Sequence, residues 1–143
     1  MKFKTDVTIE RPIEEVFEYV SDPCNFPSWN SAVQSVRGTA PGNQAAAATY
    51  LMERDLPGGR AENDLVIDVW KHPREFTLRT TSGPTPFTYR YLFSEEGSGT
   101  RIDLDGEVEL PGVAGALGPI ASLAVKRGVN WNFAELKRIL EAA

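Results

Sequence analysis

Residues 87–110 have the sequence FTYRYLFSEEGSGTRIDLDGEVEL, in which apolar and polar side chains alternate on both sides of a glycine-containing turn. Before the turn, aromatic side chains occupy every second position, at Phe87, Tyr89, Tyr91 and Phe93. After it, acidic side chains take alternate places from Asp103 to Glu109. Because neighbouring side chains of a strand point to opposite faces, this period of two predicts two antiparallel strands with one dry and one wet face.

The same pattern extends along the chain in both directions from this pair of strands. Turn signals divide residues 32–110 into six short segments. These signals lie at Pro41-Gly42, Pro57-Gly58-Gly59, His72-Pro73, Gly83-Pro84-Thr85-Pro86 and Gly97-Ser98-Gly99. A further strand is predicted at the N-terminus, since alternate residues from Phe3 to Ile9 share one face. The sequence therefore predicts a sheet of seven antiparallel strands.

Two regions have a helical period instead of a strand period. A short helix is predicted over residues 13–20, where one apolar face is formed by Ile13, Val16, Phe17 and Val20. Residues 22–31 have room for at most a second short helix. A stripe of small and apolar side chains from Ala121 to Leu140 predicts one long C-terminal helix that begins between residues 117 and 120. Helices on one face of an antiparallel sheet make an α+β fold.

The composition excludes several classes of protein. The chain has 143 residues and a formal net charge of −5, with one cysteine (Cys24) and one histidine (His72). This length predicts a single domain over residues 1–143, and the acidic balance argues against a nucleic-acid-binding protein. A lone cysteine and a lone histidine exclude an internal disulfide and a Cys/His zinc site. Because no apolar run reaches roughly 18 residues, we expect no membrane insertion and a cytoplasmic location.

Five local patterns lie at the boundaries of the predicted elements. They are IERPIEEVF (9–17), SDP (21–23) followed by PSWN (27–30), PREFTL (73–78), GTRIDL (99–104) and NFAELK (132–137). Together with the order of elements over the whole chain, they resemble the SRPBCC superfamily, which includes START lipid-binding domains, polyketide cyclase/dehydratase-like proteins and the birch-pollen-allergen fold. This resemblance implies a helix-grip fold, in which a seven-stranded curved antiparallel sheet wraps around the long C-terminal helix over an apolar cavity. It also implies one or two short helices between strands 1 and 2.

The middle of the C-terminal helix predicts a cavity independently of this resemblance. Its stripe contains small or polar residues at Ala121, Ala124, Gly128 and Asn132. Such side chains leave the hollow of a curved sheet unfilled and create the kind of space in which ligands bind. The alternative is that Gly128 only makes room for a bulky sheet residue such as Tyr91 or Phe76.

The side chains expected to face this cavity are our candidate ligand-binding residues. They are Trp29, Tyr50, Asn63, Leu65, Phe76, Tyr89, Tyr91, Gly128 and Asn132. A buried phenol needs a hydrogen-bond partner, which an asparagine or a ligand would supply to Tyr89 and Tyr91. Alternatively, these hydroxyls bond one another, the backbone or water. Trp29, which the resemblance places at the pocket entrance, is alternatively a core residue that anchors the short helices.

The remaining reactive and aromatic residues are interpreted as structural. His72 precedes a proline in a turn, which is a poor position for a catalytic base, and Cys24 is expected to be a small buried residue. Trp70 is expected on the outer face of the sheet, and Trp131 is expected to pack at the edge of the helix stripe. The acidic side chains of residues 103–109 follow one strand face and are too spread out for one ion. We therefore assign no catalytic residue, no metal and no cofactor.

Three functions are consistent with these observations. The first is binding of a small hydrophobic or aromatic ligand, lipid-like or polyketide-like, in a cavity between the sheet and the C-terminal helix. The second is an enzyme that resembles polyketide cyclases or dehydratases and uses pocket tyrosines for proton transfer. The third is a protein-interaction module of the chaperone-activator type, which would use the surface. The expected partner is a small molecule rather than a nucleic acid, and both a monomer and a homodimer remain open.

Overall fold

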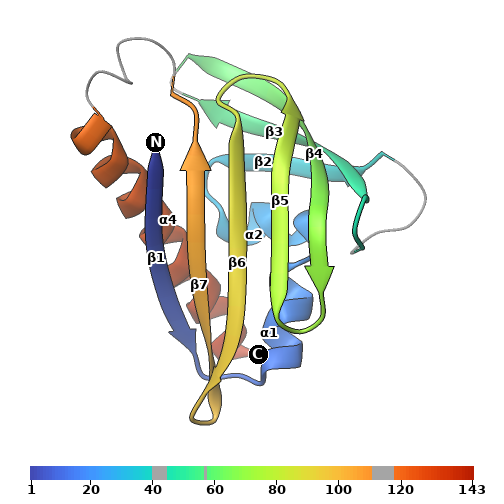
Figure 1. Ribbon diagram of the computed structural model, residues 1–143, viewed down its shortest axis with the longest axis vertical. Coiled ribbons are helices and arrows are strands. Elements are labelled where there is room, and N and C mark those ends of the chain that lie inside the picture. The colour runs from blue at the N-terminus through green and yellow to red at the C-terminus, as the bar shows by residue number, and fades with distance from the viewer. Residues whose placement is uncertain (40–44, 57, 111–117) are drawn as a thin grey trace.

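The computed structural model describes residues 1–39, 45–56, 58–110 and 118–143. In these residues one strand is followed by short helices, six further strands and a long helix (Figure 1). The elements are β1 (Lys2–Ile9), α1 (Ile13–Val20), the 3₁₀ helix η1 (Pro23–Asn25), α2 (Phe26–Trp29), β2 (Val33–Gly38), β3 (Thr49–Leu56), β4 (Gly59–Lys71), β5 (Glu75–Ser82), β6 (Phe87–Glu96), β7 (Gly99–Val108) and α4 (Gly118–Ala142). The predicted α+β helix-grip fold is confirmed.

The seven strands form one antiparallel sheet in the order β1-β7-β6-β5-β4-β3-β2. Neighbours along the chain are neighbours in the sheet, apart from β1, which pairs with β7 at the edge opposite β2. The pairing of β6 with β7 places Tyr91 opposite Leu104 and Phe93 opposite Ile102. The dry face predicted from residues 87–110 is therefore the concave face of the sheet.

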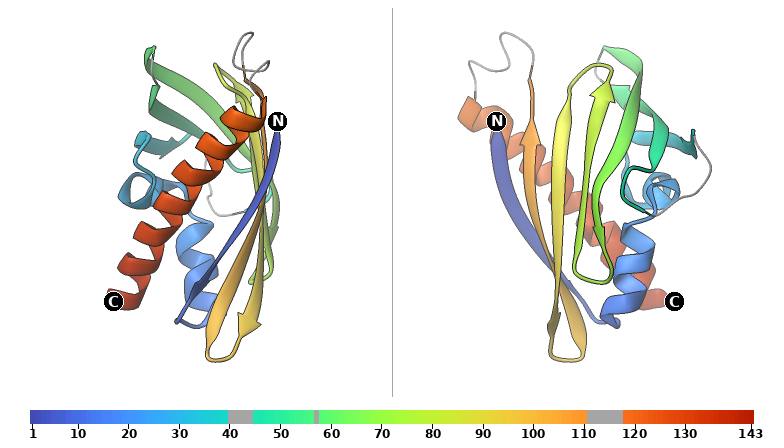
Figure 2. Two further views of the ribbon diagram at one scale, coloured as in Figure 1. Left: turned by 90° about the vertical axis from the view of Figure 1, so that its left-hand side faces the viewer. Right: turned by 45° about the vertical axis from the view of Figure 1, so that its right-hand side comes forward.

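Helix α4 crosses the concave face diagonally (Figure 2). Its C-terminal half is packed into the core through Phe133, Leu136 and Leu140, all of which are buried. Lys137 fixes this half to the sheet, since its Nζ donates to the carbonyl oxygen of Thr8 at 2.7 Å. On the same stripe the N-terminal half of α4 has no buried residue, since Val125 and Val129 are partly buried and Gly128 is exposed. This half therefore covers the sheet without filling the space beneath. Among the helices that the structure describes, none combines the length and the apolar character required to cross a bilayer.

The end of the molecule around α1 is closely packed. All four apolar residues of the predicted short helix are buried, and the side chain of Phe17 is 0% exposed. The ring of Phe17 meets those of Trp70, His72 and Phe93 at centroid distances of 5.4, 5.2 and 5.0 Å. Edge-to-face ring contacts of this kind add to the stabilisation from burial.

The expectation that Trp70 packs on the outer face of the sheet is wrong. Its indole contacts Phe17, and its Nε1 donates to the hydroxyl of Ser21 at 3.1 Å. The cause is an irregularity in the pairing of β4 with β5, where the register shifts between Ile67 and Val69. One extra residue in a strand reverses the faces of all side chains beyond it.

Trp131 and Cys24 are also placed differently from the sequence prediction. Trp131 is 76% exposed, because it lies two residues from the buried Phe133 and so about 200° around the helix. Cys24 is exposed at the turn into α2. Neither residue belongs to the core that surrounds the cavity.

Candidate functional site

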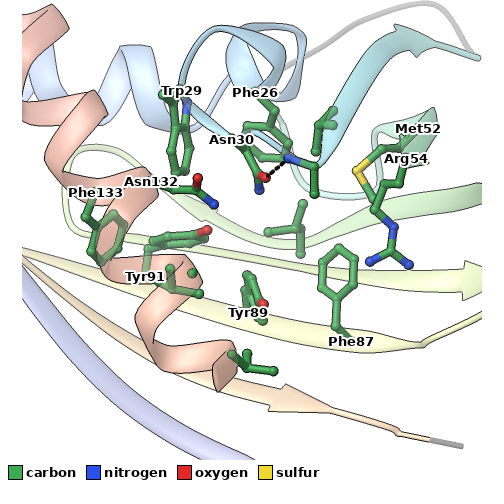
Figure 3. Close-up of a pocket in the computed structure, with 16 residues that line it drawn as sticks. Phe26, Trp29, Asn30, Met52, Arg54, Phe87, Tyr89, Tyr91, Asn132 and Phe133 are labelled. Carbon is green, nitrogen blue, oxygen red and sulfur yellow. Dashed lines mark hydrogen bonds between the residues drawn. The ribbon is translucent and has the colours of Figure 1, made fainter. Parts of the chain in front are cut away.

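A cavity of about 180 Å³ lies between α4, α2 and the concave face of the sheet. Figure 3 shows aromatic side chains from all three sides converging on it. The short helices supply Phe26 and Trp29, the sheet supplies Phe87, Tyr89 and Tyr91, and α4 supplies Phe133. A space of this size accepts at least one aromatic ring, since an engineered apolar cavity of about 150 Å³ in another protein binds benzene.

The aromatic rings form a continuous wall around this cavity. Each ring contacts the next, with centroid separations between 4.8 and 6.4 Å. The order along the wall is Phe26, Trp29, Phe133, Tyr91, Tyr89 and Phe87. At its end the guanidinium carbon of Arg54 lies 5.4 Å from the centre of the Phe87 ring. Rings that support one another in this way give the site a preformed shape.

Two tyrosine hydroxyls lie in this wall without a hydrogen-bond partner among the described residues, those of Tyr89 and Tyr91. Burial raises the pKa of Tyr89 to about 12, although the nearby charge of Arg54 acts in the opposite direction. Burial raises the pKa of Tyr91 as well, and Tyr91 is 3% exposed. Both phenols therefore keep their protons at neutral pH and are available as hydrogen-bond donors.

Alkaline pH is expected to destabilise the protein through these phenols. A raised pKa in the folded state contributes stability that is fully present below about pH 10 and is lost as the pH rises towards about 12. The free energy of unfolding of the wild type should therefore fall between about pH 10 and pH 12. In Tyr89→Phe this fall should be smaller by on the order of 1–2 kcal/mol. Urea unfolding at a series of pH values measures this difference, with Tyr19→Phe on α1 as the control. If the free energy of unfolding falls equally in Tyr89→Phe and in the wild type, the pKa of Tyr89 is not raised in the folded protein.

Two asparagines contribute amide groups whose oxygens are already occupied. The Oδ1 of Asn30 accepts from the backbone N–H of Ala32 at 3.1 Å. The Oδ1 of Asn132 accepts from the backbone N–H of Ser31 at 3.2 Å and from its hydroxyl at 3.4 Å. Within the described parts of the chain, the Nδ2 groups of Asn30 and Asn132 have no acceptor. Both amides therefore offer donors to the cavity (Figure 3).

Arg54 lines the cavity from β3, and the sequence analysis missed it. Its Nε and Nη2 donate to the Oδ1 of Asn63 at 3.0 and 2.7 Å, and Nη2 also donates to the carbonyl oxygen of Pro84 at 2.9 Å. Burial lowers the pKa of Arg54. The available signal was the alternation along β3, because Tyr50, Met52 and Arg54 share one face. The alanine run before this strand concealed that register.

The candidate residues fall into two groups in the structure. Trp29, Tyr89, Tyr91, Gly128 and Asn132 line the cavity. The other four are buried and lie outside the lining. They are Tyr50, Asn63, Leu65 and Phe76. Asn63 supports the site indirectly, since it holds Arg54 and also donates from Nδ2 to the carbonyl oxygens of Ser82 and Pro84.

Gly128 lies beside open space. A Cβ built on it would have no heavy atom within 4 Å, so this glycine is not packed against Tyr91 or Phe76. The small residue leaves part of the cavity unfilled at the middle of α4. Other residues that the sequence analysis did not select also line the cavity. They are Phe26, Asn30, Ala32, Val33, Met52, Leu78, Phe87, Val125, Val129 and Phe133.

The lone histidine and cysteine lie outside this site. His72 packs on Phe17, and its Nε2 is 3.6 Å from a carboxylate oxygen of Glu18. Although Cys24 is exposed, partial burial of its thiol raises the pKa of this group, and Asp22 adds to the rise. Across the described residues, no group of three or more His, Cys, Asp or Glu side chains is arranged to hold a metal ion.

Solved structures share this fold at low sequence identity. A protein of Thermus thermophilus is 18% identical with a TM-score of 0.82, and the match covers 100% of this chain and 99% of that one. A START superfamily protein from Mycobacterium smegmatis is 18% identical with a TM-score of 0.69, covering 99% and 94%. The di-domain ARO/CYC StfQ from the steffimycin biosynthetic pathway is 10% identical with a TM-score of 0.73, covering 97% of this chain and 44% of that chain. These likenesses show the fold alone.

The family comparison is more specific. No curated protein matches the sequence. The model of the family described as polyketide cyclase / dehydrase and lipid transport matches residues 1–141. This match confirms the resemblance to the SRPBCC superfamily that the sequence patterns indicated. The chain belongs to the polyketide cyclase / dehydrase and lipid transport family.

Proposed function

We propose that this protein binds a small hydrophobic or aromatic molecule in the cavity beneath α4. The observation that supports this proposal is the combination of an aromatic wall with unpartnered donors in one preformed space. Apolar pockets with a few placed polar groups are typical of small-molecule sites. The rings would bury the body of the ligand, and the tyrosine and asparagine groups would fix its orientation.

The lining favours binding as the role of this cavity. Its tyrosines are held in the protonated state, and its asparagine oxygens are engaged with the backbone around Ser31. Groups arranged in this way recognise acceptor atoms of a bound molecule. The family description includes both lipid transport and cyclase or dehydrase activity, and binding in the cavity is common to both.

A neutral two-ring probe, 2-naphthamide, tests this proposal. At a concentration of about 100 times its Kd, binding to the folded state adds about 2.7 kcal/mol of stability. For a chain of this length, that corresponds to a rise in Tm of about 5–10 °C. Thermal unfolding and isothermal titration calorimetry measure the two quantities. Mannitol, which is polar and lacks a ring, is the control.

Native mass spectrometry of freshly purified protein provides a second, independent measurement. A retained small molecule, displaced by 2-naphthamide, would support the proposal. No retained molecule, together with no change in Tm for 2-naphthamide or its acid, would contradict it. Chemical conversion of the retained molecule on incubation with the protein would instead favour the cyclase-like alternative.

A further inference from the structure

Arg54 brings a positive charge to the cavity wall without an ion-pair partner in the described part of the chain. Arginines on the outer face of the sheet are different. Arg79 contacts Asp68 at 2.7 Å, and Arg90 contacts Glu75 at 3.2 Å. The partners of Arg54 are instead neutral: the Asn63 amide oxygen and the carbonyl oxygens of residues 84 and 85. A charge that is half-buried among neutral groups has lost hydration without gaining a counter-charge.

The guanidinium also has unused donors. Of its five N–H groups, the one on Nε and those on Nη2 are engaged with Asn63 and with the turn between β5 and β6. Those on Nη1 have no acceptor among the described residues. Asn63 itself is 0% exposed and is held by Ser82 and Pro84, so the Arg54 side chain has a fixed orientation. A fixed guanidinium whose Nη1 keeps two free N–H groups can donate charge-assisted hydrogen bonds to a carboxylate.

The other polar groups of the cavity wall are also hydrogen-bond donors that require acceptor atoms on a ligand. Asn30 and Asn132 have their amide oxygens occupied and their Nδ2 groups free of partners in the described residues. The hydroxyls of Tyr89 and Tyr91 are protonated donors. No Asp or Glu occurs among the described residues that line the cavity. The wall is thus rich in donors and positive in charge, which complements an anionic group rich in acceptors.

We propose that the ligand is a carboxylic acid with a compact aromatic body. Its carboxylate accepts hydrogen bonds from Arg54, and its rings lie against the aromatic wall that includes Trp29 and Phe133. This inference rests on the proposed function and adds the chemical class of the ligand. The carboxylate supplies the counter-charge that Arg54 lacks, so a neutral molecule of the same shape binds more weakly.

The test compares two probes of nearly the same shape, 2-naphthoic acid and 2-naphthamide. At neutral pH the first is ionised and the second is uncharged. Isothermal titration calorimetry of the wild-type protein is expected to give a Kd for the acid at least tenfold lower than for the amide, as charge-assisted hydrogen bonds imply. Because this comparison needs no variant, its result does not depend on whether a substituted protein folds.

Three variants separate recognition of the anion from support of the fold. R54M should raise the Kd of the acid at least tenfold while changing that of the amide by less than about threefold. R54K, which keeps the charge but lacks the fork, should fall between R54M and the wild type. R60Q is the control, because Arg60 is 64% exposed on the neighbouring strand and pairs with Glu53 and Asp55. It should leave both Kd values unchanged.

The outcomes distinguish this inference from the proposed function. If the amide binds the wild type as tightly as the acid, the carboxylate assignment is wrong and the binding proposal stands. If R54M loses affinity for the acid and for the amide equally, Arg54 only supports the turn at Pro84. This outcome also overturns the carboxylate assignment. If neither probe binds the wild type and native mass spectrometry finds no retained molecule, the proposed function itself fails.

Discussion

Gly128→Phe is expected to abolish ligand binding in the cavity while leaving the protein at least as stable as the wild type. Gly128 is in the interior of α4 and lines the cavity, and a Cβ at this position meets no atom within 4 Å. A phenyl group at the edge of this space occupies volume that the ligand needs. We expect the Kd of 2-naphthamide to rise at least 30-fold, or about 2 kcal/mol.

The expected stability of this variant follows from helix propensity. Glycine in a helix interior is about 1 kcal/mol less favourable than alanine, and phenylalanine is about 0.5 kcal/mol less favourable than alanine. The free energy of unfolding, measured with urea, should therefore be unchanged or higher by up to about 0.5 kcal/mol. Arg127→Phe is the matched control, because Arg127 is at the preceding position of the helix and does not line the cavity. A wild-type Kd in a folded Gly128→Phe protein would show that the ligand binds elsewhere.

The fold was predictable because the hairpin of β6 and β7 shows its alternation without interruption. In β6 and β7 the predicted faces agree with the observed pairing, which places Tyr91 opposite Leu104 and Phe93 opposite Ile102. The prediction failed at Trp70, where the shift between Ile67 and Val69 reverses the face of the strand. A bulge has no reliable signal in a single sequence, because it depends on how the two paired strands fit together. Local patterns therefore determined the order of elements but not every side-chain direction.

Part of the cavity lining was predictable because the direction of a side chain followed from an undisturbed period. Tyr89, Tyr91 and Asn132 were found in this way, and all three line the cavity. Arg54 was missed because a charged residue in an amphipathic strand is ordinarily assigned to the wet face. Its direction follows the alternation of β3, and hydrogen bonds to Asn63 and Pro84 hold it at the cavity wall. Tertiary hydrogen bonds of this kind become visible only when the strands are paired.

The two halves of α4 divide the molecule into a packed end and an open end. Toward its C-terminus the helix buries Leu136 and Leu140 in the core, while Val125 and Gly128 line the cavity. A closely packed region stabilises a fold and an unfilled one gives up part of that stabilisation. Substitutions at the two ends should therefore affect stability and binding separately.

Among the proposed variants, Phe17→Ala is expected to lose the most folding stability, and its affinity for the ligand should not change. Phe17 is fully buried at the packed end, and its ring contacts Trp70, His72 and Phe93. Removal of a buried phenyl group leaves a cavity and costs about 3–5 kcal/mol. Because Phe17 does not line the ligand cavity, the Kd of 2-naphthamide should stay within about threefold of the wild-type value.

Urea unfolding measures this cost, and titration calorimetry at low temperature, where the variant remains folded, measures the affinity. Phe17→Leu is the matched control, because it keeps an apolar side chain that partly fills the space and should cost less than Phe17→Ala. A loss below about 1.5 kcal/mol for Phe17→Ala would show that this end repacks easily. A large change in Kd would show that the packed end and the cavity are coupled. The route would be β6, because Phe17 contacts Phe93 on this strand, which also carries Tyr89 and Tyr91. Together with Gly128→Phe, this variant determines whether stability and binding reside in different parts of the same sheet.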